Sequence, residues 1–275
     1  MKAIFKAIFK KIKAKSTSSL IEISALKTAK CEVQNLRRFS SQWLNSVFLD
    51  AQANAEWEVD KVYLNALKMP EMTGGVNPGD QRAMYYLVRT LKPTSILEIG
   101  THIGSSTTAM ALAAKRNLSD GISTTITTVD INNVNDPKLK PWLNFSSPAS
   151  PAKLIEQIDC SELVRFETNS SVNFLNKQQS FDLIFLDGDH SASAVYTEIP
   201  LALQRLNQDG IIVLHDFFPG GQPLWPGQTP LLGPFLALER FSREDALFQV
   251  IPMGELPWPT KLGSCVTSLA ILAKI

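Results

Sequence analysis

Hydrophobic positions in this chain form short runs that are separated by longer stretches with helical spacing. Runs of strand length occur at residues 95–99, 125–131, 163–167, 181–186 and 210–214. Helical patterns fill most of the gaps, and strands that alternate with helices favour a parallel sheet covered on both faces. Two later runs, 246–251 and 265–273, have no helix between them, so they predict an antiparallel hairpin at the sheet edge.

The part of the chain before the first strand has a different pattern. Residues 17–70 show helical stripes without strand alternation, which predicts two or three helices. A glycine-rich loop at 72–80 and a helix at 81–91 follow. We expect a helical arm and cap over residues 1–75 and a main domain over 76–275. The expected fold class is α/β: N-terminal helices and a Rossmann-like, mostly parallel, seven-stranded sheet with an antiparallel C-terminal hairpin.

Composition and charge narrow the range of functions. The 275 residues are 44% hydrophobic and 19% charged, which allows one large α/β domain with an accessory element. The formal net charge is +1, and no basic run with interleaved aromatics follows the N-terminus, so we expect a small-molecule substrate and no nucleic acid. Cys31, Cys160 and Cys265 form no CxxC pair, which fits a reducing cytoplasm. No stretch approaches the roughly 18 apolar residues of a membrane span.

The first fifteen residues carry only positive charges. Ile4, Ile8 and Ile12 recur there at helical spacing, which predicts a basic amphipathic helix. Two interpretations stay open. The helix packs on the domain or on a second subunit of a homodimer, or it contacts an anionic membrane surface peripherally. The segment lacks the apolar stretch and the cleavage site of a secretory signal.

The strongest chemical signal is ILEIGTHIGSST at residues 96–107, where a strand passes through a glycine turn into an Ala-rich helix. Gly100 and Gly104 allow a sharp turn and a close approach to a ligand. Dinucleotide enzymes have GxGxxG here to bind a pyrophosphate, but this chain has His102 at the second glycine and Glu98 before the turn. That carboxylate would repel pyrophosphate and suits an ammonium group, which points to S-adenosylmethionine. A plain strand-to-helix turn is the alternative.

An acid at the end of the second predicted strand supports a nucleoside ligand. Asp130 can accept hydrogen bonds from ribose hydroxyls, as acids do at this position of Rossmann folds. This feature does not distinguish a methyl donor from a nicotinamide cofactor. An Asp that only caps a loop would look the same.

Polar residues also follow the fourth and fifth predicted strands. They are Asp187, Asp189 and His190 after the fourth strand, and His215 and Asp216 after the fifth. Ligands of doubly wound sheets bind beyond the carboxyl ends of the strands, so these groups are expected to face one cleft. Carboxylates and a histidine in such positions predict a divalent-cation site. Acids that cap helices or bind loop amides are the alternative.

With these motifs the sequence resembles the class I S-adenosylmethionine-dependent methyltransferases, in the group that includes catechol-type O-methyltransferases and the macrocin and cephalosporin-pathway enzymes. The resemblance covers roughly residues 75–275 and includes the pattern ExGxxxGxS followed by a ribose-binding acid. It implies that Asn169 and Ser170 lie along the adenine. The residues expected to bind the donor are Glu98, Gly100, His102, Gly104, Ser106, Asp130, Asn169, Ser170 and Asp187.

The resemblance also implies catalytic roles. Catechol-type enzymes hold magnesium with groups that correspond here to Asp187, His215 and Asp216. Because a histidine replaces one oxygen ligand, manganese is considered beside magnesium. The catalytic lysine of those enzymes corresponds to His190, which could accept a proton at neutral pH. Asp187 and His190 are therefore the expected catalytic residues.

The expected activity is transfer of a methyl group from S-adenosylmethionine to a hydroxyl of a small molecule, a secondary metabolite or a sugar, with or without a metal. The Pro- and Gly-rich loop at 218–234, with Trp225, Phe235 and the N-terminal helices, is expected to cover the site. A nicotinamide-dependent oxidoreductase is the competing enzyme, disfavoured because GxGxxG and a suitable Tyr-x-x-x-Lys pair are missing. A non-catalytic nucleoside-binding protein on the same fold stays open.

Overall fold

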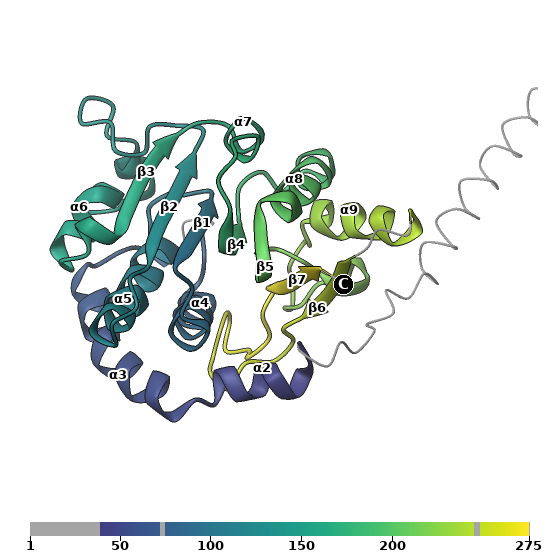
Figure 1. The fold of residues 1–275 in the computed structure, drawn as a ribbon, viewed down its shortest axis with the longest axis horizontal. Helices are drawn as coiled ribbons and strands as arrows, with labels where there is room; N and C mark the ends of the chain where they lie inside the picture. The colour runs from purple at the N-terminus through teal and green to yellow at the C-terminus, as the bar shows by residue number, and fades with distance from the viewer. Residues whose placement is uncertain (1–38, 72–74, 245–247, 275) are drawn as a thin grey trace, which may run out of the picture.

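A seven-stranded mixed sheet lies at the centre of the described part of the chain (Figure 1). The structure is a computed structural model that describes residues 39–71, 75–244 and 248–274, so the helix expected over the first fifteen residues lies outside it. Side by side, the strands are β3 (Val164–Thr168), β2 (Thr125–Asp130), β1 (Ser95–Ile99), β4 (Phe181–Leu186), β5 (Leu206–Leu214), β7 (Ala270–Lys274) and β6 (Phe248–Pro252). Strands β1 to β5 are parallel, and β7 is antiparallel to both neighbours, which confirms the predicted fold class.

The predicted strands agree closely with the observed ones except at two places. Strand β5 begins at Leu206 rather than Gly210, because exposed polar residues near its start hide it from a hydrophobicity pattern. Strand β7 begins at Ala270 rather than Cys265, and the preceding residues belong to a loop. The C-terminal hairpin is antiparallel as predicted, with β6 as the outer strand.

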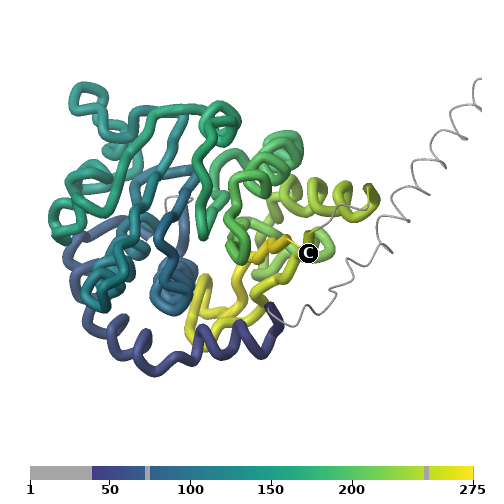
Figure 2. Tube along the Cα trace, in the orientation of Figure 1, coloured from purple at the N-terminus to yellow at the C-terminus, as the bar shows by residue number. Residues whose placement is uncertain are grey.

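Helices cover both faces of the sheet (Figures 1 and 2). One face carries α4 (Pro78–Leu91), α5 (Ser105–Ser119) and α6 (Pro151–Gln157), with α2 (Ser41–Phe48) and α3 (Ala51–Ala66) packed on them. The other face carries α7 (Ser171–Leu175), α8 (Ala192–Arg205) and α9 (Leu232–Arg243). Short 3-10 turns are η1 (Pro141–Phe145), η2 (Ser161–Leu163) and η3 (Pro219–Gly221). No helix in this part of the chain is long and apolar enough to span a membrane.

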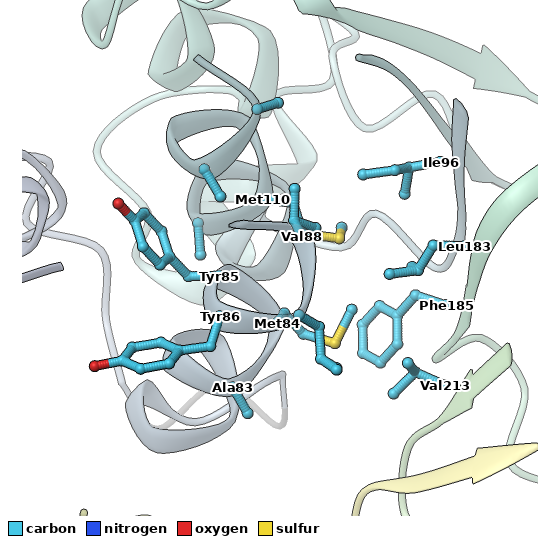
Figure 3. Packing of buried hydrophobic residues seen from close by; sticks show 14 of the residues in the cluster. Ala83, Met84, Tyr85, Tyr86, Val88, Ile96, Met110, Leu183, Phe185 and Val213 are labelled. Atoms are coloured by element: carbon cyan, nitrogen blue, oxygen red, sulfur yellow. The ribbon is translucent and has the colours of Figure 1, made fainter. Parts of the chain in front are cut away.

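The larger hydrophobic core lies between the sheet and α4 (Figure 3). Met84 and Val88 of α4 are fully buried and point toward the sheet, where Phe185 of β4 is also fully buried. Tyr85 points to the opposite side, toward α3. Burial of one such side chain is worth about 1.5–3 kcal/mol. This interface therefore holds α4 firmly against the strand whose carboxyl end carries Asp187.

Helices α2 and α3 pack on α4 and α5 rather than over the strand ends. The ring centroid of Trp57 in α3 lies 5.2 Å from that of Tyr85. The buried Asp60 accepts hydrogen bonds from Tyr85 at 2.7 Å and from Arg116 of α5 at 2.6 Å. The expectation that these two helices cover the active site is therefore wrong. In the described residues before α4, only the segment after α3, with Glu71 and Gly75, reaches toward it.

Candidate active site

The carboxyl ends of β1, β2 and β4 meet beneath a cleft of about 680 Å³. Backbone hydrogen bonds between these strands continue beyond the last residue of each strand. The Gly100 N–H donates to the Val129 carbonyl at 2.8 Å, and the Asp187 N–H donates to the Ile99 carbonyl at 2.9 Å. The side chains that follow each strand are therefore held in fixed positions relative to one another.

Gly100 is required by the close approach between the ends of β1 and β4. Its φ is +98°, and a Cβ at this position would lie 2.1 Å from the carbonyl oxygen of Asp187. Glycine alone avoids both the steric clash and the backbone strain. Gly104, with φ +83°, precedes α5 and is not among the residues that line the cleft; a Cβ added there would lie 3.1 Å from the Pro151 side chain. Gly104 therefore shapes the turn without lining the cleft.

Glu98 lies behind the cleft rather than in it. Its side chain is fully buried, and its carboxylate accepts hydrogen bonds from Ser106 at 2.5 Å, Thr107 at 2.5 Å and Thr128 at 2.6 Å. The structure therefore contradicts a direct contact of the Glu98 or Ser106 side chain with the donor, because these groups are bonded to one another beneath the turn. Glu98 instead joins β1 to β2 and to the first turn of α5.

The burial of Glu98 should make stability depend on pH. Burial raises the pKa of Glu98 to about 7 from 4.5, although the hydroxyls of Ser106, Thr107 and Thr128 oppose this shift. The folded state then holds this proton more tightly than the unfolded chain, so the free energy of unfolding should fall as the pH rises through that interval, by roughly 3 kcal/mol.

The variant Glu98→Gln cannot lose a proton, so it should lack this part of the pH dependence. Urea unfolding of both proteins across the interval measures the difference, and other titrating groups cancel because both proteins contain them. Parallel stability profiles would show that the folded and unfolded states bind this proton equally.

Most side chains expected to bind the donor do line the cleft. The expected residues that line it are Gly100, His102, Asp130, Asn169, Ser170 and Asp187. Asp130 accepts a hydrogen bond from the backbone N–H of His102 at 3.1 Å, which joins the candidate ribose-binding acid to the glycine turn. The His102 ring contacts Phe145 edge-on at a centroid distance of 4.2 Å. Burial lowers the pKa of His102, so its imidazole is neutral at pH 7.

The cleft contains an acid that the sequence did not reveal. Glu198 of α8 is buried and lines the cleft near Ser171. Burial raises the pKa of Glu198 to about 6, although the Ser171 hydroxyl opposes the shift. In the sequence, Glu198 looks like any other charged residue of a surface helix.

Three polar side chains form a cluster where β4 and β5 end. One possible ligand atom from each of Asp187, His190 and Asp216 lies within 4.8 Å of the others. Nε2 of His190 is 3.8 Å from Oδ1 of Asp187 and 3.5 Å from Oδ2 of Asp216. Two carboxylates and an imidazole are a donor set that fits a divalent cation.

His215 is not part of this cluster, which corrects the expected set of metal ligands. Its buried imidazole lies between two acids, with Nδ1 2.8 Å from Asp187 and Nε2 3.3 Å from Asp80. Burial alone would lower the pKa of His215, but the carboxylates of Asp187 and Asp216 outweigh it and hold the pKa well above its usual value. The His215 ring therefore contacts an acid through each of its nitrogens, and neither nitrogen belongs to the three-residue cluster.

Asp80 supports the cluster from behind. It lies in the first turn of α4, is fully buried, and accepts hydrogen bonds from Thr267 at 2.5 Å and Asn77 at 2.6 Å. With His215 it forms a buried chain of contacts that ends at Asp187. This role cannot be recognised from the sequence, because acids are common in the first turn of helices.

A second cavity, of about 430 Å³, opens beside Asp216. Trp225 of the loop after β5 lines it, as does Lys261 of the loop between β6 and β7. The predicted covering loop thus reaches the site through Trp225, whereas Phe235 lies in α9 and lines neither cavity.

The cluster lies at the junction of the two cavities. Asp187 and His190 line the first cleft, Asp216 lines the second cavity, and Gly75 lines both. Two molecules, one bound in each cavity, would therefore meet at these three polar side chains. This is the arrangement that a reaction between two bound molecules requires.

Comparison with known proteins finds a matching domain family and similar solved structures. Residues 97–217 match the family described as "Methyltransferase domain". One similar solved structure is an O-methyltransferase of tomaymycin synthesis from Streptomyces achromogenes with S-adenosylmethionine; the TM-score is 0.52, the identity is 17%, and 87% of this chain and 97% of that chain are covered. Another is an O-methyltransferase from Bacillus cereus with S-adenosylhomocysteine; the TM-score is 0.50, the identity is 20%, and 86% of this chain and 96% of that chain are covered. A third is a methyltransferase from Podospora anserina with S-adenosylhomocysteine; the TM-score is 0.51, the identity is 17%, and 94% of this chain and 96% of that chain are covered. Among curated proteins, none matches the sequence.

The chain contains a methyltransferase domain and has the fold of the class I S-adenosylmethionine-dependent methyltransferases. The likeness to solved structures establishes the fold, and the family match shows a methyltransferase domain over residues 97–217. The predicted fold is confirmed, and the methyltransferase domain at residues 97–217 agrees with the predicted enzyme class. These findings favour a methyltransferase over the nicotinamide-dependent oxidoreductase.

Proposed function

We propose that this chain transfers the methyl group of S-adenosylmethionine to a hydroxyl oxygen of a small molecule. The observation that carries the proposal is the position of Asp187, His190 and Asp216 at the junction of two cavities. The donor would occupy the cleft at the ends of β1, β2 and β4, and the acceptor would occupy the cavity beside Asp216. Two of the similar structures are O-methyltransferases, which supports oxygen as the methylated atom.

The reaction is an in-line displacement. The acceptor oxygen forms a bond to the methyl carbon while the bond from that carbon to sulfur breaks. The sulfonium becomes a neutral thioether, and the hydroxyl proton leaves to a base or to solvent. Because the donor is already activated, the protein's main contribution is to hold oxygen, carbon and sulfur in line.

We further propose that Asp187, His190 and Asp216 hold a divalent cation, magnesium or manganese. Such a cation supplies positive charge that lowers the pKa of a coordinated hydroxyl. The attraction of His215 and His190 lowers the pKa of Asp216 to about 2 despite its burial, so this carboxylate is ionised at neutral pH. Nε2 of His190 faces both carboxylates, so this atom holds either a cation or a proton, never both.

Replacing Asp130 with Ala tests the donor site. The change should weaken binding of S-adenosylmethionine and S-adenosylhomocysteine by about 1–3 kcal/mol, because ribose hydroxyls would lose their acceptor in a partly buried site. Calorimetric titration measures the affinities. Asp136→Ala is the matched control, since Asp136 also accepts backbone hydrogen bonds, from Lys138 at 2.7 Å and Leu139 at 3.1 Å, but lies outside the cleft. Equal affinities in all three proteins would remove Asp130 from the donor site.

A further inference from the structure

The cavity beside Asp216 contains polar groups whose bonding is incomplete within the described residues. We propose that the acceptor carries an anionic group, a carboxylate, which binds the ammonium of Lys261 and the indole N–H of Trp225. This inference rests on the proposed function, because it takes this cavity as the acceptor site. It specifies the substrate class as hydroxylated acids.

Trp225 supplies the first donor. Its side chain is 4% exposed, and its Nε1 is buried with no hydrogen-bond partner in the part of the chain that the structure describes. The ring is held by Phe218, at a centroid distance of 6.2 Å, and the Trp225 carbonyl accepts a hydrogen bond from the Gln228 N–H at 3.3 Å. A buried N–H without an acceptor is unfavourable, so a ligand oxygen beside it would be stabilising.

Lys261 supplies the second donor and the charge. Its Nζ lies 5.3 Å from the centroid of the Trp225 ring, a cation–π distance, and both residues line this cavity. No carboxylate pairs with this ammonium among the residues of known position. A defined turn holds Lys261, because the Thr260 N–H donates to the Ser264 carbonyl at 2.7 Å and the Ser264 N–H donates to the Lys261 carbonyl at 3.0 Å.

The charges in this cavity separate into an acidic part and a basic part. Asp216 already faces two imidazoles, with Nε2 of His190 at 3.5 Å and Nδ1 of His215 at 3.6 Å. The exposed Glu71 also lines the cavity but makes no ion pair with Lys261. An acceptor would thus place its hydroxyl at Asp216 and its carboxylate at Lys261. Gln228, whose buried Oε1 has no hydrogen-bond partner among the described residues, would accept a hydrogen bond from a further hydroxyl.

Matched acids and amides test this assignment. We would titrate 3,4-dihydroxybenzoate and 3,4-dihydroxybenzamide into the full chain saturated with S-adenosylhomocysteine and magnesium, and measure both affinities by calorimetry. The wild type should prefer the acid by about tenfold or more, as a hydrogen bond to a charged group implies. Lys261→Met should abolish the preference, and Lys261→Arg should retain it. Lys138→Met, a control on an exposed loop outside both cavities, should match the wild type.

The outcomes separate this inference from the proposed function. Equal affinities for acid and amide, binding of neither, or a preference that survives Lys261→Met would overturn the assignment of Lys261. Methyl transfer to a neutral hydroxylated acceptor alone would overturn it while leaving the proposed function intact. If the proposed function itself is wrong, no methyl transfer to any hydroxyl will be observed, which is a different result from those above. The variant Trp225→Phe, which keeps the ring and removes the N–H, should reduce the preference for the acid without abolishing it.

Discussion

Chelation of divalent cations is expected to stop methyl transfer while leaving the affinity for S-adenosylmethionine nearly unchanged. Asp187 and His190 also line the donor cleft, but the groups expected to bind the ribose and the adenine, which are Asp130, Asn169 and Ser170, are not members of the cluster. Asp187→Asn and Asp216→Asn should behave alike. Each should lower the rate by roughly 10²–10⁴-fold, the scale on which a proton-transfer or charge-stabilising group acts. Initial rates and cation binding by calorimetry measure the two effects.

The control for these variants is Asp189→Asn. Asp189 lies between Asp187 and His190 in sequence and lines the donor cleft, but its carboxylate accepts the Ser191 N–H at 2.8 Å and is outside the cluster. This variant should keep its response to added cation. Full activity in chelator, with a mild loss in His190→Ala, would refute both the cation and the proton-accepting role. The site would then work by proximity alone.

Gly100→Ala is expected to destabilise the fold strongly and to disrupt the donor cleft. The added Cβ would meet the Asp187 carbonyl oxygen at 2.1 Å, and backbone atoms can relieve that clash only by separating the ends of β1 and β4. Overpacking and the unfavourable φ together should cost about 3 kcal/mol or more. Affinity for S-adenosylhomocysteine should fall as well, because the displaced residues line the donor cleft.

Gly121→Ala separates the clash from the effect of backbone conformation. Gly121 also has a positive φ, +83°, but an added Cβ would have nothing within 4 Å. This variant should lose only the roughly 1–2 kcal/mol that an L-residue pays in the left-handed region, and its donor affinity should match the wild type. Urea unfolding and calorimetric titration of both variants provide the comparison. Equal losses in the two variants would show that the approach to Asp187 does not determine the site.

The order of elements was predictable because each strand of the parallel sheet is a short apolar run. Strands β1 and β4 are buried on both faces, so their hydrophobicity marks their bounds. Proline-rich segments made some helices difficult to recognise from the sequence. Helix α9 begins at Leu232 and contains Pro234 in its first turn, so it was assigned in part to a loop. Proline is tolerated there because the first helical N–H groups have no partner within the helix.

The sequence predicts which strand ends carry the residues of the candidate site, but it does not predict the directions of their side chains. A pattern that puts His215 and Asp216 after one strand cannot show that His215 turns toward α4, where Asp80 lies 135 residues away in sequence. The same limit applies to Glu98, whose carboxylate binds three hydroxyls behind the cleft instead of lining it. Side-chain direction depends on tertiary neighbours, and a single sequence does not record them.

Isotope transfer is the most direct test of methyl transfer from S-adenosylmethionine to a hydroxyl. The full chain would be incubated with S-adenosylmethionine labelled in its methyl carbon, with magnesium or manganese, and with an extract of hydroxylated small molecules. The predicted result is label in a methoxy group, with an equal amount of S-adenosylhomocysteine, and a much slower transfer by Asp187→Asn. Label only on nitrogen or carbon, or no transfer together with binding of NAD in place of S-adenosylmethionine, would contradict it.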